Sequence, residues 1–453
     1  MEDYEELKTF IKIWFLAISS LCYCYLISTR ISNGITRLLS FLPVIIFFFI
    51  LPLPLSSIHL AGPTIFYLIW LGNFKLILFA FNRGPLASTP PLRFIIFMSI
   101  ALLPINPKKT VTKTSDPHPY PYSYPDPLPD SSHNPISLAL KALILAIIIH
   151  CYQYKNNLHE YIILGFYCIH VYLGVELILA ITAYSVKLFL GLGFEIEPQF
   201  NEPYLATSLQ DFWGRRWNLM VTSILRQTVY DPIRVLLLPI LGNVKSRLIA
   251  IFMTFVVSGL MHELIYFYLT RVWPTWEVTW FFVLHGVCTA IEVAVKKVVS
   301  GRFLLHRAVS GPITVAFVAV TGVWLFLPQI LRNGVDIKAI NEYSILVNFL
   351  RSKWNVVIFP LQTNAGITAE KSVQEPIAKT STVNNASDSQ PEIAAEKMIA
   401  RRTLLQNRDE TIADGKRVKV LSGKSSLRTD KIVGTAIEQA KKDAKCSLLQ
   451  AIM

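Results

Sequence analysis

Long apolar stretches dominate this chain of 453 residues, and they constrain its fold more than any other feature. A helix that crosses the roughly 30 Å hydrocarbon core of a bilayer needs about 20 consecutive apolar residues. Only 16% of the residues are charged, against about 25% in an ordinary soluble domain. The sequence therefore predicts an all-α, polytopic helical membrane protein with about 8–10 transmembrane helices. The stretches span residues 10–29, 38–55, 58–81, 136–154, 160–190, 246–269, 276–295 and 311–331, and a shorter one spans 92–105.

The charged residues outside these stretches bear on the membrane topology and on the binding partners of the protein. The acidic flank "MEDYEELK" is wrong for a cleaved signal peptide, so we expect the first stretch to be a retained transmembrane helix. The net charge of +13 suggests contacts with anionic headgroups or with a phosphate-bearing substrate. Positive residues are spread over too many connections to fix the membrane orientation. The six cysteines show neither metal-ligand spacing nor a disulfide framework.

Two polar regions divide the chain. Residues 104–135 are rich in proline, which favours an extended aqueous loop; a docking site for a proline-binding module is the alternative to a plain connector. Charge density rises in the tail, and no aromatic residue follows Phe359, so residues 361–453 are expected to be poorly ordered. We therefore expect transmembrane helices over 1–103 and a second transmembrane region over 136–360.

Two ionisable residues interrupt one apolar stretch, "VVSGLMHELIYFYLT" at 256–270. His262 and Glu263 are costly to place in lipid, so they are candidates for a functional site. A zinc-protease helix would need a second histidine four residues after the first, and Tyr266 occupies that position. The sequence therefore predicts no metal at His262.

The helical period places His262 on one face with polar neighbours. Ser258 lies one turn before it and Tyr266 one turn after it, whereas Glu263 points about 100° away. A neutral imidazole in apolar surroundings can accept a proton, as a general base must. The alternative is a histidine that only makes a hydrogen bond within a helix bundle.

A second polar constellation lies upstream, in residues 201–234. Ser208 followed by Asp211 is typical of a helix N-cap with an acid three residues on. Arginines mixed with aromatic residues suit a helix at the membrane interface and could bind phosphate, although contact with lipid headgroups explains them as well. Asn218 is a polar group among apolar ones and needs a partner. The mixed residues are Phe212, Trp213, Arg215, Arg216, Trp217, Leu219, Met220, Arg226 and Arg234.

These two segments together carry a family resemblance. "SLQDFWGRRWN", which ends at Asn218, is followed 44 positions later by His262 in "SGLMHE". This pattern resembles the plant wax synthases, long-chain-alcohol O-fatty-acyltransferases of the membrane-bound O-acyltransferase superfamily. The likeness runs from about residue 5 to Lys353 and does not include the tail.

The resemblance implies a site and an activity. The catalytic residues would be His262 and Asn218, in a ring of tilted helices around a tunnel formed by the catalytic region 136–360. Acyl-CoA would enter from the cytosolic side as co-substrate, with a lipid alcohol as acceptor, in the endoplasmic reticulum membrane. No other cofactor, metal or nucleic acid is expected. The candidate substrate-binding residues are Arg215, Arg216, Trp217, Glu263 and His285, and for His285 a structural hydrogen bond is the alternative.

Other functions remain open at this point. The acceptor could be a sterol or another lipid alcohol, because the residues that line the tunnel cannot be identified from the sequence. A transporter would also place histidines and acids in membrane helices, but it should show internal repeats, and none is evident. The unfamiliar tail could also mark an altered product that keeps the membrane region with impaired activity.

Overall fold

The computed structural model describes residues 2–88, 91–106, 135–190, 196–299, 306–345 and 347. The chain divides into two compact units, Met1–Thr363 and Asn364–Met453, and every described residue belongs to the first. Most of the predicted proline-rich loop and all of the predicted tail lie outside the described residues.

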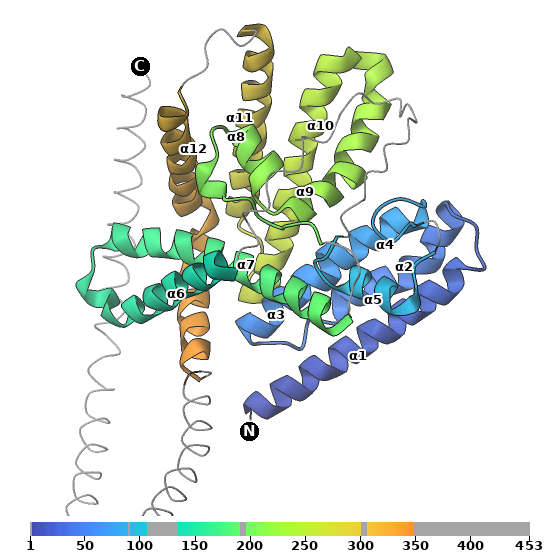
Figure 1. Cartoon of the computed structure of the whole chain (residues 1–453), viewed down its shortest axis with the longest axis horizontal. Coiled ribbons are helices and arrows are strands. Elements are labelled where there is room, and N and C mark those ends of the chain that lie inside the picture. The colour runs from blue at the N-terminus through green and yellow to red at the C-terminus, as the bar shows by residue number, and fades with distance from the viewer. Residues whose placement is uncertain are drawn as a thin grey trace, which may run out of the picture. The chain divides into compact units, whose positions relative to one another are not determined.

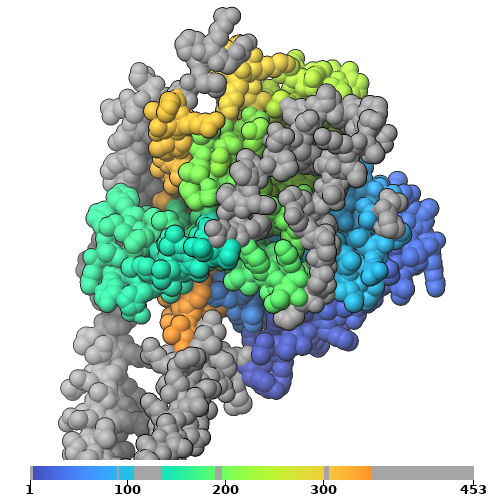
Figure 2. Space-filling view, in the orientation of Figure 1, coloured from blue at the N-terminus to red at the C-terminus, as the bar shows by residue number. Residues whose placement is uncertain are grey.

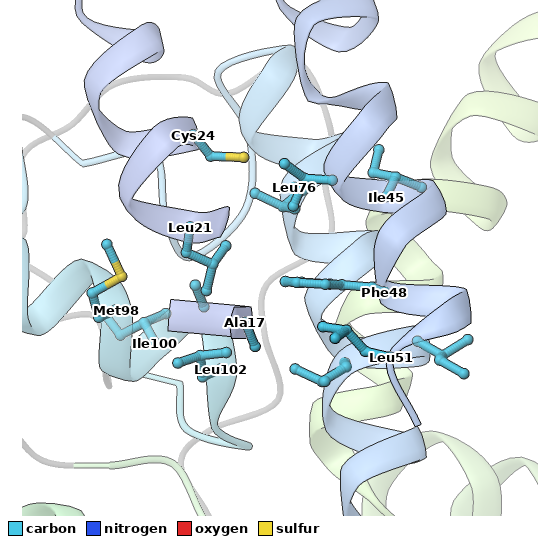
Figure 3. Close-up of a cluster of buried hydrophobic side chains, with 14 of the residues drawn as sticks. Ala17, Leu21, Cys24, Ile45, Phe48, Leu51, Leu76, Met98, Ile100 and Leu102 are labelled. Carbon is cyan, nitrogen blue, oxygen red and sulfur yellow. The ribbon is translucent and has the colours of Figure 1, made fainter. Parts of the chain in front are cut away.

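The N-terminal helices are packed around a shared apolar core. They are α1 (Glu2–Ser28), α2 (Ile35–Ile50), α3 (Ile58–Ile65), η1 (Phe66–Gly72), α4 (Asn73–Ala80) and α5 (Phe94–Leu102). Figure 3 shows Leu21 of α1, Phe48 of α2, Leu76 of α4 and Ile100 of α5 converging, and all four side chains are fully buried. Burial of such side chains is what fixes these four helices against one another.

The C-terminal helices follow residue 134 and are joined by short connections. They are α6 (Pro135–Cys151), η3 (Tyr152–Asn157), α7 (Glu160–Leu190), η4 (Pro203–Leu205), α8 (Leu209–Asp211), η5 (Phe212–Arg216), α9 (Leu219–Leu225), η6 (Arg226–Tyr230), α10 (Asp231–Thr270), α11 (Glu277–Val299), α12 (Arg307–Thr321), η7 (Gly322–Phe326) and α13 (Pro328–Arg332). Gly242, with a φ of 71°, breaks α10, and the chain turns sharply there (Figure 1). Figure 2 shows that α6 and the first half of α7 stand out from the side of the unit.

The predicted membrane class is confirmed. Within the described part of the chain, seven helical spans are long and apolar enough to cross a bilayer, and α2 is a further apolar helix of 16 residues. The shorter predicted stretch contains α5, which has nine residues. Large apolar side chains face outward, such as Phe15 at 69% exposed and Leu26 at 62% exposed on α1. Outward apolar faces on helices of this length are suited to contact with lipid.

Two glycines let α11 approach α10 closely. A Cβ added at Gly259 would lie 3.1 Å from Cα of Thr279, and one added at Gly286 would lie 2.8 Å from Cβ of Phe255. Small residues permit such approach between membrane helices. The pairing of α10 with α11 brings Phe282 of α11 against the face of α10 that carries His262.

Candidate active site

A cavity of about 620 Å³ runs through the helical unit, within the size range of small-molecule sites. It follows one face of α10, where Arg247, Ser258, His262, Tyr266 and Leu269 line it. Arg247 and His262 are 15 positions apart, which is about 22 Å along a helix. The predicted shared face of Ser258, His262 and Tyr266 is thereby confirmed, and His262 lies between the two ends of the cavity.

His262 presents one ring nitrogen that the fold leaves available. Its Nδ1–H donates to the carbonyl oxygen of Ser258, at 2.8 Å. In the neutral ring, that bond leaves the lone pair on Nε2. No described residue forms a hydrogen bond with this nitrogen, and the half-buried ring lines the cavity. The arrangement provides a proton acceptor inside the cavity.

Aromatic rings hold the His262 imidazole in place. Phe282 stacks on it with ring centroids 4.2 Å apart, and Trp70 of η1 meets it edge-on at 5.0 Å. Phe326 of η7 lies 5.8 Å from it. Three helices therefore fix the orientation of the ring, and apolar walls surround it.

Asn218, the last residue of the motif "SLQDFWGRRWN", lines the same cavity as His262. Its backbone is left-handed, with φ 38° and ψ 69°, a conformation that asparagine tolerates better than most residues. Its Oδ1 accepts from the backbone N–H of Val221 at 3.3 Å and caps α9. Among the described residues none accepts from Nδ2, so this amide donor is available to a ligand.

A short segment, residues 199–201, fixes the backbone beside Asn218, and we call this segment the strap. The N–H of Leu219 donates to the carbonyl of Gln199 at 2.8 Å, and the N–H of Asn201 donates to the carbonyl of Arg216 at 2.9 Å. Gln199 is buried, and its Nε2 donates to the carbonyl of Pro104 at 2.8 Å. The strap connects the Asn218 turn to the chain that follows α5.

The structure separates the arginines that the sequence marked: Arg226 and Arg234 line the cavity, whereas the candidate substrate-binding residues Arg215 and Arg216 do not. Arg216 is tied to Asp211 at 2.8 Å, and exposed Arg215 also lies outside the cavity lining. The ion pair with Asp211 extends the predicted N-cap, which is confirmed by the bond from the N–H of Asp211 to Oγ of Ser208 at 3.2 Å. The cavity is lined instead by Arg226, Arg234 and Arg247.

We call the part of the cavity that is lined by Arg226, Arg234 and Arg247 the arginine end. Nε of Arg234 is buried and has no partner among the described residues, while its second terminal nitrogen donates to Oδ1 of Asn243 at 3.2 Å. Nε of Arg226 lies 4.0 Å from Asp231. A cluster of guanidinium groups at a cavity end is suited to phosphate.

Of the other predicted substrate-binding residues, Trp217 lines the cavity, whereas Glu263 and His285 do not. Glu263 is buried and accepts from the N–H of Trp276 at 2.9 Å and from Oγ1 of Thr279 at 3.0 Å, so it caps the start of α11. His285 is fully buried, and its Nδ1–H donates to the carbonyl of Phe281 at 2.8 Å. These contacts give both residues a place in helix packing rather than in substrate binding.

The opposite end of the cavity is polar in a different way, and we call it the tyrosine end. Tyr343 lies between two histidines: its OH is 3.3 Å from Nε2 of His170, and its ring centroid is 4.2 Å from that of His59. Nδ1 of His59 is 2.7 Å from Oε2 of Glu342. Hydrogen bonds to the Glu342 carboxylate from Ser57, Ile58 and His59 outweigh the effect of burial and lower its pKa to about 2.

Several lining residues could not be identified from the sequence. Trp70, Phe282 and Tyr343 give no sequence signal, because each reaches the site through packing between distant segments. Arg247 follows the break at Gly242, which resets the helical phase. In the part of the chain that the structure describes, no group of three or more His, Cys, Asp or Glu residues could hold a metal ion.

Comparison with known proteins adds independent information. Residues 196–284 match the sequence model of the membrane bound O-acyl transferase family, and this range contains both Asn218 and His262. The chain is 48% identical over 362 residues to a long-chain-alcohol O-fatty-acyltransferase of Simmondsia chinensis, covering 78% of this chain and 98% of that protein.

Two proteins of Arabidopsis thaliana are similar to a comparable extent. A probable long-chain-alcohol O-fatty-acyltransferase 1 is 48% identical over 354 residues, covering 77% of this chain and 98% of that protein. An acyl-CoA–sterol O-acyltransferase 1 is 45% identical over 361 residues, covering 78% of this chain and 100% of that protein.

Proposed function

The chain belongs to the membrane-bound O-acyltransferase family, and from this premise we propose that it forms wax esters from a fatty acyl-CoA and a long-chain alcohol. The observation that carries the proposal is the cavity itself. One largely apolar cavity contains a proton acceptor, Nε2 of His262, an amide donor, Nδ2 of Asn218, and arginines at one end.

His262 acts as the general base in this proposal. The alcohol oxygen attacks the thioester carbonyl while its proton passes to Nε2; the C–O ester bond forms and the C–S bond breaks. Coenzyme A leaves as a thiolate, which is a good leaving group because a thiol has a pKa of about 8.5. The thiolate then takes the proton from His262, so no other acid or base is consumed. General-base catalysis of this kind contributes roughly 10²–10⁴-fold.

Asn218 has the geometry of a fixed donor. Its left-handed backbone and its bond to Val221 hold the amide group while leaving Nδ2 available. A preorganised donor stabilises the negative charge that develops on the carbonyl oxygen. The structure gives no hydrogen bond between Asn218 and His262, so the two groups act on the substrate rather than on each other.

The arginine end is assigned to coenzyme A. Arg226, Arg234 and Arg247 would meet its phosphates, and the pantetheine arm would extend along α10 and bring the thioester to His262. Trp217, stacked on Phe212 with centroids 5.5 Å apart, forms part of the wall on the way. The apolar enclosure also limits water, which would otherwise hydrolyse the thioester.

The acceptor class has one specific rival. A sterol is the alternative acceptor, because one of the similar proteins is named for sterol acylation. The endoplasmic reticulum is the membrane we propose, on the basis of the family resemblance. The chain is in either case an integral, multi-pass membrane protein.

The test is an acceptor panel in microsomes from a host without neutral-lipid acyltransferases. Labelled palmitoyl-CoA is supplied with hexadecanol, a sterol or diacylglycerol, and His262→Ala serves as the control at equal expression. We expect label in hexadecyl palmitate for the intact chain. Sterol ester alone would establish the alternative, and no ester from well-folded protein with any acceptor would overturn the proposal.

A further inference from the structure

The glycines of the described helices differ in what an added Cβ would meet. At Gly165, Gly214 and Gly322 it would meet nothing within 4 Å, and Gly214 of η5 also lines the cavity. At Gly72, Gly259 and Gly286 an added Cβ would lie 3.3 Å or less from a neighbouring atom, so helix packing requires glycine there. At Gly62 in α3 an added Cβ would meet nothing within 4 Å, and at Gly174 in α7 it would meet only Cδ2 of His170, at 3.7 Å. Helix packing therefore does not explain these two glycines.

Both of these glycines line the cavity. Glycine in a helix interior is less favourable than alanine, so a glycine without a packing role suggests another use of the space. At Gly174 the backbone is helical and does not need the conformational freedom of glycine, whereas Gly62 precedes Pro63 in α3, where a missing Cβ also relieves crowding by the proline ring. What the two positions share is empty volume that faces the inside of the cavity.

Their neighbours place them between the tyrosine end and His262. Along α3 and η1 the lining residues include His59, Gly62, Phe66 and Trp70, and Trp70 meets the His262 ring. Along α7 they include His170, Gly174 and Ile178, each one turn from the next. Both rows begin beside Tyr343, whose ring contacts the rings of His59 and His170.

Gly62 and Gly174 therefore border one section of the cavity, which we call the glycine section. It lies on the far side of His262 from Arg247, because Arg271, just past the other end of α10, donates to the carbonyls of Leu53 and Leu55, which directly precede α3. An acyl-CoA held at the arginine end would block that approach to the base. The glycine section then remains as an approach to His262 for the alcohol, whose hydrocarbon part would lie between the two glycines.

We propose that Gly62 and Gly174 determine acceptor specificity. The glycine section is wide enough for a lipid alcohol with a branch or a ring close to its hydroxyl carbon, as well as for a straight-chain alcohol. This inference rests on the proposed function, and it deepens it by defining the acceptor class. A side chain at either position would occupy the space of the branch and leave room for a straight chain.

The experiment compares two alcohols of equal carbon number, hexadecanol and 2-hexyldecanol, as acceptors for palmitoyl-CoA. Gly62→Leu and Gly174→Leu are measured in microsomes at equal folded protein, and the reading is the ratio of branched to straight ester. Gly165→Leu is the matched control, because Gly165 is also in α7, has nothing within 4 Å of an added Cβ, and does not line the cavity.

We expect the intact chain to esterify both alcohols and each cavity variant to lower the branched-to-straight ratio at least tenfold. A few methylenes of excess volume in a pocket are enough for such discrimination. Gly165→Leu should keep the ratio of the intact chain. Gly62→Ala and Gly174→Ala, which add only a Cβ, give a smaller shift in the same direction and replace the leucine variants if those fail to fold.

Two results would overturn this inference while leaving the proposed function intact. One is an intact enzyme that esterifies hexadecanol but not 2-hexyldecanol. The other is an unchanged ratio in the variants, with a shift in preference among acyl-CoA chain lengths instead, which would place the acyl chain in the glycine section. Absence of ester from every alcohol with the intact chain would overturn the proposed function itself.

Discussion

Two histidines in the candidate membrane spans of α10 and α11 differ only in what surrounds them. His262 and His285 each donate from Nδ1 to the carbonyl four residues earlier, at 2.8 Å in both cases. Nε2 of His285 lies 3.4 Å from Oγ1 of Thr321 in a fully buried position. His262 lines the cavity, and no described residue bonds its Nε2.

The difference shows that a histidine in a membrane helix is not by itself a site. The local bond fixes the tautomer equally in both regions, so the tautomer cannot distinguish a base from a packing residue. Access to the cavity distinguishes them. The following changes test this comparison, beginning with the largest expected effect.

The largest effect is expected from removing the available nitrogen. His262→Ala should lower the rate of ester formation by about 10²–10⁴-fold. Among the described residues that line the cavity, no other base lies beside the aromatic rings that contact His262. The measurement is the initial rate with saturating palmitoyl-CoA and hexadecanol, normalised to folded protein. A rate within a fewfold of the intact chain would return His262 to a packing role.

The next effect is expected at Asn218. Asn218→Asp keeps the oxygen that caps α9 but loses the Nδ2 donor, so the rate should fall by about 10²–10³-fold with little loss of stability. Asn218→Gly is the companion variant, because it keeps the left-handed backbone and loses the whole side chain. If the aspartate variant were fully active and the glycine variant unstable, Asn218 would serve only as a helix cap.

A smaller effect is expected at the second histidine. His285→Leu fills similar volume and should retain most of the activity, while the lost hydrogen bond costs about 1–3 kcal/mol of stability at most. Thermal unfolding followed by size-exclusion fluorescence, together with the initial rate, separates the two consequences. A loss of rate as large as that of His262→Ala, in a variant that remains folded, would contradict the comparison.

The smallest effect is expected at the tyrosine end, where a third histidine, His59, pairs with Glu342. The lowered pKa of Glu342, about 2, means that its carboxylate stabilises the fold above its usual pKa of about 4.3. That contribution falls as the pH drops from about 4.3 through about 2. Glu342→Gln should therefore have a lower thermal midpoint than the intact chain at pH 7, and the two should converge as the pH approaches 2. A constant difference across this range would contradict the carboxylate's role.

Much of the fold could be predicted from composition and period. Apolar runs specify membrane helices because lipid requires every backbone group to be bonded internally. The same period placed Ser258, His262 and Tyr266 on one face and Glu263 on another, as the structure finds. The N-cap at Ser208 was also readable, because its signal is confined to four residues.

The choice of arginines could not be predicted in the same way. Residues Phe212–Arg216 and Arg226–Tyr230 form π-helical turns, which shift the phase of the side chains relative to an α-helix. Composition marks Arg215, Arg216, Arg226 and Arg234 alike, and only the fold separates those that line the cavity. Asn218 adds a left-handed residue between these turns, which no periodic pattern anticipates.

The central claim is that His262 is open to substrate and His285 is not, and this can be measured directly. Diethyl pyrocarbonate reacts with unprotonated imidazole nitrogens, and peptide mass spectrometry would resolve His262 from His285 and from the cavity residues His59 and His170. We predict that His262 is labelled at the rate at which ester formation is lost, that palmitoyl-CoA protects it, and that His285 stays unlabelled. Full labelling of His262 with activity retained, or loss of activity while His262 stays unlabelled, would contradict the account.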